Sequence, residues 1–286
     1  MEARWWHPSA ACPVVWSTRR AYMLTALNAL LLSAGLTVSA TTRSECSLED
    51  SAYGTAGTGH VTERPLHMTI HSGHRLRDYY LFVPGSIAPD TPAPVLLLLH
   101  GSYLTPLDVL PPWADVAQRA GVILAAPKSS AAYGWRIRED SPALLRDIVD
   151  DIATRRPIDR RRLYLFGYSS GAAHALTLGL LESQYFAAVA VYAGAFREPG
   201  SFKLIPLAQR KIPLWITIGD RDQFFTMKDV RATEAALRDG GFPLVLTIIK
   251  GHDHLYTDVA PSVNRAACAF LEPIALSQPP AFVSYQ

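Results

Sequence analysis

Residues 163–171 have the sequence Leu-Tyr-Leu-Phe-Gly-Tyr-Ser-Ser-Gly, which is the strongest structural signal in the chain. Four apolar residues typical of a buried strand lead into a Gly-x-Ser-x-Gly turn centred on Ser169, and a helix is expected over residues 171–182. The flanking glycines allow the turn to close without a Cβ clash. The turn lifts the serine hydroxyl above the sheet edge, beside the free N–H groups that begin the helix. The sequence therefore predicts Ser169 as a nucleophile; the alternative is a turn serine without a chemical role.

The segments on either side of this turn alternate between strand and helix patterns. The apolar run at residues 95–99 has no polar alternation, which indicates a strand buried on both faces. Further strands are expected at 122–126, 163–166, 187–192, 214–218 and 244–249, and helices at 113–119, 142–154, 171–182, 228–238 and 262–271. Residues 66–71 and 77–83 are expected to form an antiparallel hairpin, and the three arginines at 160–162 a solvated turn. The pattern predicts an α/β fold with a mostly parallel central sheet.

A serine hydroxyl needs a general base, and the base needs an acid to orient it. Two histidines, His252 and His254, follow the expected strand 244–249, and two carboxylates, Asp220 and Asp222, follow strand 214–218. The chain order Ser, Asp, His is the one that this type of fold requires. Spacing favours Asp222 as the acid, because Asp220 is close enough to the strand end to cap the turn. The two histidines could instead bind a metal, but no third ligand has suitable spacing, so no metal is expected.

An oxyanion formed at Ser169 needs two N–H donors. One is expected from Ser170, which follows the nucleophile. The other is expected from Ser102, in the loop after strand 95–99, where a neighbouring glycine allows close backbone approach. His100 is expected to brace this loop. Trp135, in the loop after strand 122–126, is expected to border the site and to line a substrate pocket. The alternative is a surface-loop tryptophan with a purely structural packing role.

The motifs together resemble the α/β-hydrolase superfamily, and within it the secreted esterases grouped with polyhydroxybutyrate depolymerases and feruloyl esterases. The resemblance covers roughly residues 66–272 and rests on these segments: 100–101, 167–171, 219–222 and 252–254, with weaker support from 77–84, 157–164 and 186–190. It implies the α/β-hydrolase fold with helices on both faces of the sheet, catalysis without a cofactor, and His254 as the catalytic histidine. The family varies widely at the positions of Ser102 and Tyr103, so the resemblance does not predict which acyl groups this chain prefers.

The resemblance implies an exported serine esterase in which Ser169, His254 and Asp222 form the catalytic triad. Tyr168 and Tyr103, together with Trp135, are candidates for substrate binding. The expected partner is a small-molecule or oligomeric ester. Three alternatives remain open: a serine peptidase on the same fold, a polyhydroxyalkanoate depolymerase, and a protein that binds without catalysis.

The amino-acid composition is that of a globular protein and gives no support for binding to nucleic acid or nucleotides. The chain has 286 residues, of which 49% are hydrophobic and 18% charged, as in ordinary globular proteins and unlike disordered chains. The 27 basic and 25 acidic residues give a formal net charge of +2, too small to favour a nucleic acid partner. No glycine-rich phosphate-binding motif is present in the sequence.

The N-terminal region has the features of an export signal. Residues 21–40 contain no charged side chain, follow Arg19 and Arg20, and end in Val38-Ser39-Ala40, which has the small-x-small form of a cleavage site. The pair of arginines also resembles a twin-arginine motif, so a secreted or periplasmic protein is expected. The alternative is an uncleaved membrane anchor, since the apolar run is just long enough to span a bilayer. We expect residues 1–40 to be the signal, 41–65 a loose lead-in, and 66–286 one catalytic domain with a short tail.

Two cysteines remain after removal of such a signal. Cys46 and Cys268 stand near opposite ends of the exported chain. Because cysteines of exported proteins often pair, a disulfide between them is expected. The alternative is two unpaired thiols, with Cys268 as a small buried residue of the core.

Overall fold

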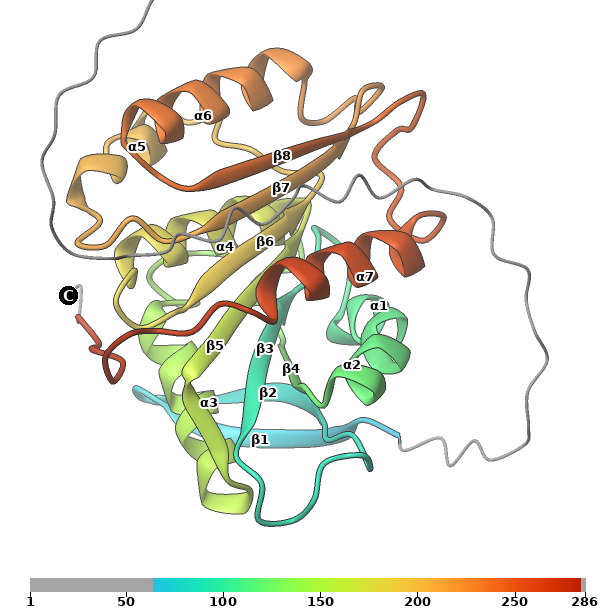
Figure 1. Ribbon diagram of the computed structural model, residues 1–286, viewed down its shortest axis with the longest axis vertical. Coiled ribbons are helices and arrows are strands. Elements are labelled where there is room, and N and C mark those ends of the chain that lie inside the picture. Colours follow the sequence, from blue (N-terminus) through green and yellow to red (C-terminus); the bar gives the residue numbers. More distant parts are fainter. Residues whose placement is uncertain (1–63, 284–286) are drawn as a thin grey trace, which may run out of the picture. The chain divides into compact units, whose positions relative to one another are not determined.

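A mixed sheet of eight strands forms the centre of the protein in the computed structural model, which describes residues 64–283 (Figure 1). The strands are β1 (Leu66–Ser72), β2 (Arg75–Phe82), β3 (Ala93–Leu99), β4 (Ile123–Pro127), β5 (Ile158–Tyr168), β6 (Ala188–Tyr192), β7 (Leu214–Gly219) and β8 (Leu244–Ile249). Their order across the sheet is β1-β2-β4-β3-β5-β6-β7-β8. β1 and β2 form an antiparallel hairpin, β2 pairs antiparallel with β4, and all remaining pairs are parallel. The predicted α/β fold with an N-terminal hairpin is therefore confirmed.

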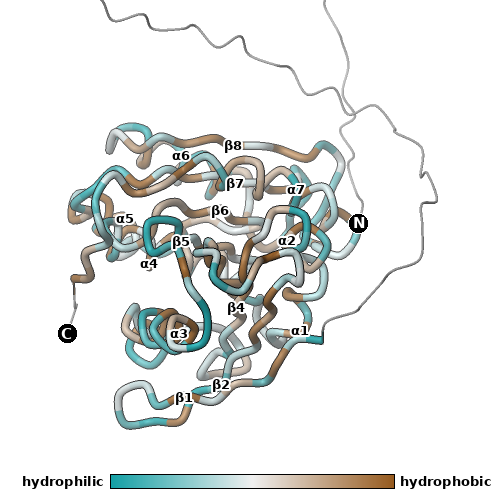
Figure 2. Tube along the Cα trace, turned by 60° about the horizontal axis from the view of Figure 1, so that its bottom comes forward, coloured by the Kyte–Doolittle hydropathy of each residue, from teal (hydrophilic) through white to brown (hydrophobic). Residues whose placement is uncertain are grey.

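Helices cover both faces of the sheet, as Figures 1 and 2 show. They are α1 (Pro106–Val109), α2 (Ala114–Ala120), α3 (Pro142–Arg155), α4 (Ser170–Leu181), α5 (Pro199–Phe202), α6 (Met227–Asp239) and α7 (Ala260–Leu271), with short 3₁₀ turns at Pro111–Trp113 and Ile205–Leu207. Apolar side chains of α3, α4 and α6 join the core on one face, and those of α1, α2 and α7 the core on the other. Among the described residues, no helix is long and apolar enough to cross a membrane.

The alternation of side chains along β3 explains why this strand is apolar at every position. Val95, Leu97 and Leu99 belong to the core beneath α3 and α4. Leu96 and Leu98 point to the opposite face and belong to the core beneath α2 and α7. Successive residues of a strand face opposite sides, so a strand covered on both faces buries all of them.

One local prediction differs from the structure. The predicted turn at residues 160–162 is wrong, because β5 begins at Ile158 and runs through the three arginines. Pairing with β3 shifts register between Ala93 and Val95, which accommodates this extra length of strand. The arginines lie where β5 leaves the buried centre of the sheet, and Arg162 forms an ion pair with Asp159. The helix expected at 113–119 is present as α2, one residue later at each end, and α1 and a 3₁₀ turn that the sequence did not predict precede it.

Candidate active site

Ser169 occupies a sharp turn between β5 and α4. Its backbone has φ 58° and ψ −119°, a conformation that costs a non-glycine residue energy and persists only where the surroundings enforce it. A Cβ on Gly167 would lie 2.3 Å from the Gly171 carbonyl oxygen, and a Cβ on Gly171 would lie 2.1 Å from that of Leu99. Both glycines are therefore needed because the backbones approach closely. The Ser169 N–H donates to the Tyr192 carbonyl (3.1 Å), which ties the turn to β6.

His254 lies between Ser169 and Asp222 and is within hydrogen-bond distance of both. Its Nε2 is 2.8 Å from Ser169 Oγ, and its Nδ1 is 2.7 Å from Asp222 Oδ2. Because a carboxylate only accepts, Nδ1 carries the proton and Nε2 is left to accept from the serine hydroxyl. The side chain of His254 is 13% exposed and that of Asp222 only 1%. The three side chains thus form a continuous hydrogen-bonded series from a buried carboxylate to a hydroxyl.

The second oxygen of Asp222 is held by two backbone amides. Oδ1 accepts from the N–H groups of Phe224 (2.8 Å) and Phe225 (2.9 Å) in the turn after β7. The Phe224 ring also packs against His254, with centroids 4.7 Å apart. No feature of the sequence identifies these two residues as part of the site, because a backbone N–H leaves no signal in residue type. Their effect is to orient the carboxylate so that Oδ2 faces the imidazole.

The other candidates for acid and base, Asp220 and His252, make hydrogen bonds within the same turns. Asp220 Oδ1 accepts from the Gly251 N–H at 2.6 Å, which joins the turn after β7 to the loop after β8. His252 directs Nε2 toward the carbonyl oxygen of Leu255 (2.8 Å) and away from Ser169. The two histidines therefore do not share a ligand position. Among residues 64–283, no group of three His, Cys, Asp or Glu side chains is arranged to hold a metal ion.

Two buried tyrosines support the loop that carries His254. The Tyr168 hydroxyl donates to the His254 carbonyl (3.1 Å), and the Tyr192 hydroxyl donates to the Leu255 carbonyl (3.1 Å). Burial raises the pKa of both hydroxyls above the ordinary value, so both remain protonated donors at neutral pH. Tyr168 also places its ring 5.4 Å from the imidazole and lines the cleft above Ser169.

The two predicted oxyanion donors lie beside the nucleophile. Ser102 follows β3, and Ser170 is the first residue of α4, where helical N–H groups have no acceptor within the helix. In the described part of the chain neither N–H donates a hydrogen bond, and both residues line the same cleft as Ser169. A Cβ on Gly101 would lie 3.2 Å from the Cβ of Ser169, so the loop after β3 passes close to the turn. The arrangement leaves two free donors next to the serine hydroxyl.

Two adjoining clefts open at this site. The first, of about 410 Å³, lies over Ser169 and is lined by Tyr103 and Tyr168 among others. The second, of about 490 Å³, is lined by Trp135, and it shares Ser170, Arg197 and Phe225 with the first. The Tyr103 side chain is 80% exposed, whereas Trp135 is half-buried with its indole N–H bonded to a backbone carbonyl. Of the three predicted substrate-binding residues, two therefore lie in the cleft over Ser169 and one in its neighbour.

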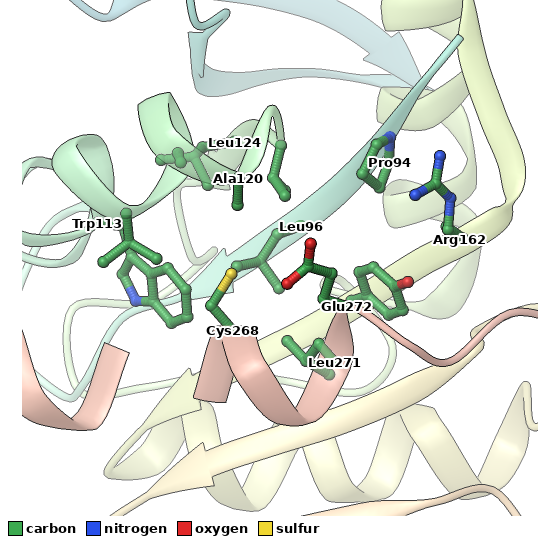
Figure 3. Close-up of a pocket in the computed structure, with 13 residues that line it drawn as sticks. Pro94, Leu96, Trp113, Ala120, Leu124, Arg162, Cys268, Leu271 and Glu272 are labelled. Atoms are coloured by element: carbon green, nitrogen blue, oxygen red, sulfur yellow. The ribbon is translucent and has the colours of Figure 1, made fainter. Parts of the chain in front are cut away.

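A separate, small apolar cavity of about 40 Å³ lies between β3, α2 and α7 (Figure 3). Leu96, Trp113 and Leu271 contribute to its wall together with Cys268, whose thiol has a pKa raised to about 11 by burial. None of the residues around Ser169 lines this cavity, so it is not part of the candidate active site. Cys46 lies outside the described residues, as do the predicted export signal and lead-in, so the disulfide stays a prediction.

Comparisons with known proteins place the chain among hydrolases. A model of the dienelactone hydrolase family matches residues 114–272, more than half of the chain. A bifunctional acetylxylan esterase/xylanase from Neocallimastix patriciarum is 26% identical over 170 residues; these are 57% of this chain and 24% of that protein. The chain thus spans about a quarter of the length of this curated relative.

Solved structures share the fold at low sequence identity. A ferulic acid esterase from the anaerobic fungus Anaeromyces mucronatus superposes with a TM-score of 0.59 at 17% identity, covering 76% of this chain and 93% of that chain. An acylaminoacyl peptidase from Pyrococcus horikoshii gives a TM-score of 0.58 at 16% identity, covering 77% and 43%. These similarities establish the α/β-hydrolase fold, on which both esterases and peptidases occur.

Proposed function

Because the chain belongs to the dienelactone hydrolase family, we propose that it is a serine hydrolase that cleaves carboxylic esters through an acyl-enzyme intermediate. The observation that carries the proposal is the hydrogen-bonded series from Asp222 through His254 to Ser169, which ends beneath an open cleft. This arrangement of acid, base and hydroxyl is the one by which a weak nucleophile is activated for acyl transfer.

In the proposed first half-reaction, Ser169 Oγ attacks the ester carbonyl carbon while its proton passes to His254 Nε2. The imidazole becomes cationic, and the buried carboxylate of Asp222 stabilises that charge without taking the proton. The carbonyl oxygen becomes an oxyanion and accepts hydrogen bonds from the N–H groups of Ser102 and Ser170. The tetrahedral intermediate then collapses, and His254 gives its proton to the departing alcohol.

The second half-reaction repeats these steps with water. His254 Nε2 accepts a proton from a water molecule, which attacks the acyl carbon of the ester formed on Ser169. The same two N–H groups stabilise the second oxyanion, and the proton returns to Ser169 Oγ as the carboxylic acid leaves. The chain's own residues supply every proton transfer in this scheme.

The clefts favour a flat or extended substrate. Tyr103 is 80% exposed and Phe224 is 61% exposed, and both line the cleft over Ser169. Exposed aromatic side chains at the rim of a cleft offer rigid apolar surface for an aromatic ring or a sugar face. The similar proteins are described as acetylxylan and ferulic acid esterases. We therefore place aromatic acyl esters and acetyl esters of sugars first among the candidate substrates.

The decisive experiment compares ester and amide hydrolysis by the wild-type protein and Ser169→Ala. The substrates are nitrophenyl esters from acetate to decanoate, methyl ferulate, acetylated xylan, polyhydroxybutyrate film, and an aryl amide of a peptide. We expect ester turnover that falls at least about 10⁴-fold in Ser169→Ala, because loss of the nucleophile removes the covalent route. Ser170→Ala serves as the matched control, since it retains the backbone N–H.

The outcomes separate the candidate functions. Ester turnover that survives in Ser169→Ala would exclude the proposed nucleophile. Amide cleavage faster than ester cleavage would identify a peptidase, and selective hydrolysis of polyhydroxybutyrate film would identify a depolymerase. A higher kcat/KM for methyl ferulate than for nitrophenyl acetate would support the aromatic cleft as the acyl site.

We also propose that the protein is exported and that residues 1–40 are removed. The basic pair before an uncharged run and the small residues at its end support this proposal. Expression of the full chain in a bacterium, followed by mass spectrometry of the secreted and periplasmic fractions, tests it. A product that begins at Thr41 is expected, whereas full-length protein in the membrane fraction would indicate an uncleaved anchor.

A further inference from the structure

The segment between β4 and α3, residues 128–141, packs against the loop that carries the proposed oxyanion donor Ser102. We call residues 128–141 the brace loop and residues 100–103 the oxyanion loop. The Trp135 indole N–H donates to the His100 carbonyl (2.8 Å). The Ser129 N–H donates to His100 Nε2 (3.2 Å), while His100 Nδ1 donates to the Gly101 carbonyl (2.8 Å). The ring of His100 is thus neutral and bonded at both nitrogens, and burial lowers its pKa.

Two more hydrogen bonds join the loops on the far side of Gly101. The Ser102 hydroxyl donates to the Tyr133 carbonyl at 2.7 Å. The Tyr103 N–H donates to the Ala132 carbonyl at 2.6 Å, and Tyr103 has a φ of 61°. A side chain in this left-handed region is strained unless neighbouring contacts hold it. The brace loop therefore contacts the oxyanion loop on both sides of the peptide unit that carries the Ser102 N–H, the proposed oxyanion donor.

One buried carboxylate organises the brace loop itself. The Asp140 side chain is 0% exposed, and its two oxygens accept four hydrogen bonds within the loop and from β2. Oδ1 accepts from the Ser130 N–H (2.9 Å) and from Arg77 (2.5 Å), and Oδ2 accepts from the Ser130 hydroxyl (2.8 Å) and the Arg136 N–H (2.8 Å). Arg77 is 10% exposed and also donates to the Glu139 and Lys128 carbonyls.

The same residue links the loop to the helix of the nucleophile. His174, in α4, donates from Nε2 to the Asp140 carbonyl at 2.8 Å. Its ring stacks on Trp135, with centroids 5.3 Å apart and an interplanar angle of 16°. Burial lowers the pKa of His174 to about 4, so the ring is neutral at physiological pH. Asp140 is thus tied to the element that begins with the second proposed donor, Ser170.

We propose that Asp140 is a positioning residue for ester hydrolysis, because its carboxylate shapes the brace loop and thereby aims the Ser102 N–H at the oxyanion. The proposal rests on the proposed function of Ser169. It assigns no contact between Asp140 and the substrate. The loop geometry matters because oxyanion donors act only when they are preorganised around the position that the charged oxygen will occupy. A displacement of a few tenths of an ångström at Ser102 weakens that interaction in the transition state more than in the ground state.

The test is Asp140→Asn, with Glu139→Gln as the matched control. The asparagine amide has the shape of the carboxylate, but one oxygen is replaced by an NH₂ group. This NH₂ group faces donors that hydrogen-bond to a carboxylate oxygen in the wild type, and it cannot accept from them. Glu139 is the adjacent acid, and among the described residues its carboxylate makes no hydrogen bond or ion pair. We expect kcat per active site, counted with a fluorophosphonate, to fall about 10- to 100-fold in Asp140→Asn with KM changed less than about threefold. Glu139→Gln should match the wild type in both constants.

A second measurement reports on the loop without turnover. Hydrogen exchange of peptides covering residues 99–104 should be at least about tenfold faster in Asp140→Asn than in Glu139→Gln, because the brace contacts open more often. If Asp140→Asn does not fold, Trp135→Phe replaces it, since this change removes one donor to His100 and keeps the aromatic ring. It should reproduce the selective loss of kcat at a smaller scale.

The results distinguish this inference from the proposed function. Unchanged kcat and unchanged exchange in Asp140→Asn, in an enzyme that hydrolyses esters, would overturn the positioning role. A loss of active-site count with normal kcat per site would indicate a purely structural role and overturn it as well. If the wild type hydrolyses no ester, the proposed function fails and the positioning role in ester hydrolysis fails with it; the exchange data would then show separately whether Asp140 holds the loop.

Discussion

His254 Nε2 lies 2.8 Å from Ser169 Oγ, although the two residues are 85 positions apart in the chain. The parallel sheet accounts for this proximity, because β5 and β8 end at the same edge with only β6 and β7 between them. The turns at that edge also touch directly: a Cβ on Gly219 would lie 2.1 Å from the carbonyl oxygen of His252. The loop after β8 therefore packs against the turn after β7, and this contact places His254 next to Ser169.

The two aspartates of the turn after β7 should differ sharply in their effect on catalysis. Asp222→Asn is expected to reduce kcat by about 10³- to 10⁴-fold, because an amide cannot hold the imidazole in the required tautomer and orientation. Asp220→Asn should reduce kcat less than about tenfold, since its carboxylate only accepts from the Gly251 N–H. Steady-state kinetics on a nitrophenyl ester measures both. Equal losses in the two variants would contradict the assignment of the acid.

The two histidines after β8 offer a second matched pair. His254→Ala removes the proposed base, and kcat should fall by at least about 10⁴-fold. His252→Ala removes a side chain that is bonded to the Leu255 carbonyl and should change kcat less than about tenfold. Both variants should be compared after circular dichroism shows that they are folded. Loss of activity in His252→Ala alone would reverse the assignment.

Tyr103 is expected to act on substrate binding. Its ring is 80% exposed and lines the cleft over Ser169. Tyr103→Ala should raise KM for aromatic esters by about three- to thirtyfold while kcat changes little, because the ring binds ground state and transition state alike. Nitrophenyl acetate and methyl ferulate, assayed side by side, provide the comparison. A fall in kcat with constant KM would show instead that the ring holds the oxyanion loop.

Glu182 should make stability depend on pH. The side chain is 1% exposed, Oε2 accepts from the Val283 N–H (2.7 Å), and in the described structure Oε1 has no partner. Burial raises the pKa of this carboxyl from 4.5 to about 7. A raised pKa in the folded state means that the protonated form is favoured, so stability is fully present below pH 4.5 and is lost as pH rises through 7.

Glu182→Gln should remove this loss. The variant is expected to be more stable than the wild type by about 1–3 kcal/mol at pH 8.5 and similar to it at pH 4.5. Urea unfolding at the two pH values measures the difference. A constant difference across pH would show that ionisation of Glu182 is not its cause. Glu234→Gln, on α6, provides a carboxylate control: its side chain is 16% exposed and its pKa is lowered by Arg231.

The exported protein should contain a disulfide between Cys46 and Cys268. The two thiols would lose two electrons and two protons to a disulfide oxidant of the exporting compartment, which is reduced to two thiols. We expect no reaction with a thiol reagent in denaturant before reduction, and two labels after it. The cross-link should stabilise by up to about 4–5 kcal/mol according to the chain-entropy relation, so Cys46→Ser should lower Tm. Two labels without reduction would contradict the pairing.

The sequence by itself predicts the order of the elements and the position of the nucleophile. Burial patterns and turn residues are local, and the stretch from the β5 core to Gly171 contains the strand, the turn and the start of the helix within nine residues. Because these signals are local, the prediction of a turn at residues 160–162 is wrong. Whether β5 continues through these residues depends on its pairing with β3 and on the ion pairs of the arginines, which local patterns do not show.

Only the tertiary structure decides which side chains meet. Asp220 and Asp222 stand two residues apart, as do His252 and His254. Spacing favours Asp222 and the family resemblance favours His254, but neither signal brings a side chain to the serine hydroxyl. The choice depends on the distance to a hydroxyl held on another strand, which is a property of the packed sheet. The brace formed by Asp140 has no local sequence signal, because its carboxylate accepts from the backbone N–H groups of Ser130 and Arg136 and from Arg77 on a distant strand. Residue type is informative about local backbone geometry. The site, in contrast, consists of contacts between turns that are distant in the sequence, and these contacts form only when the sheet and its helices have packed together.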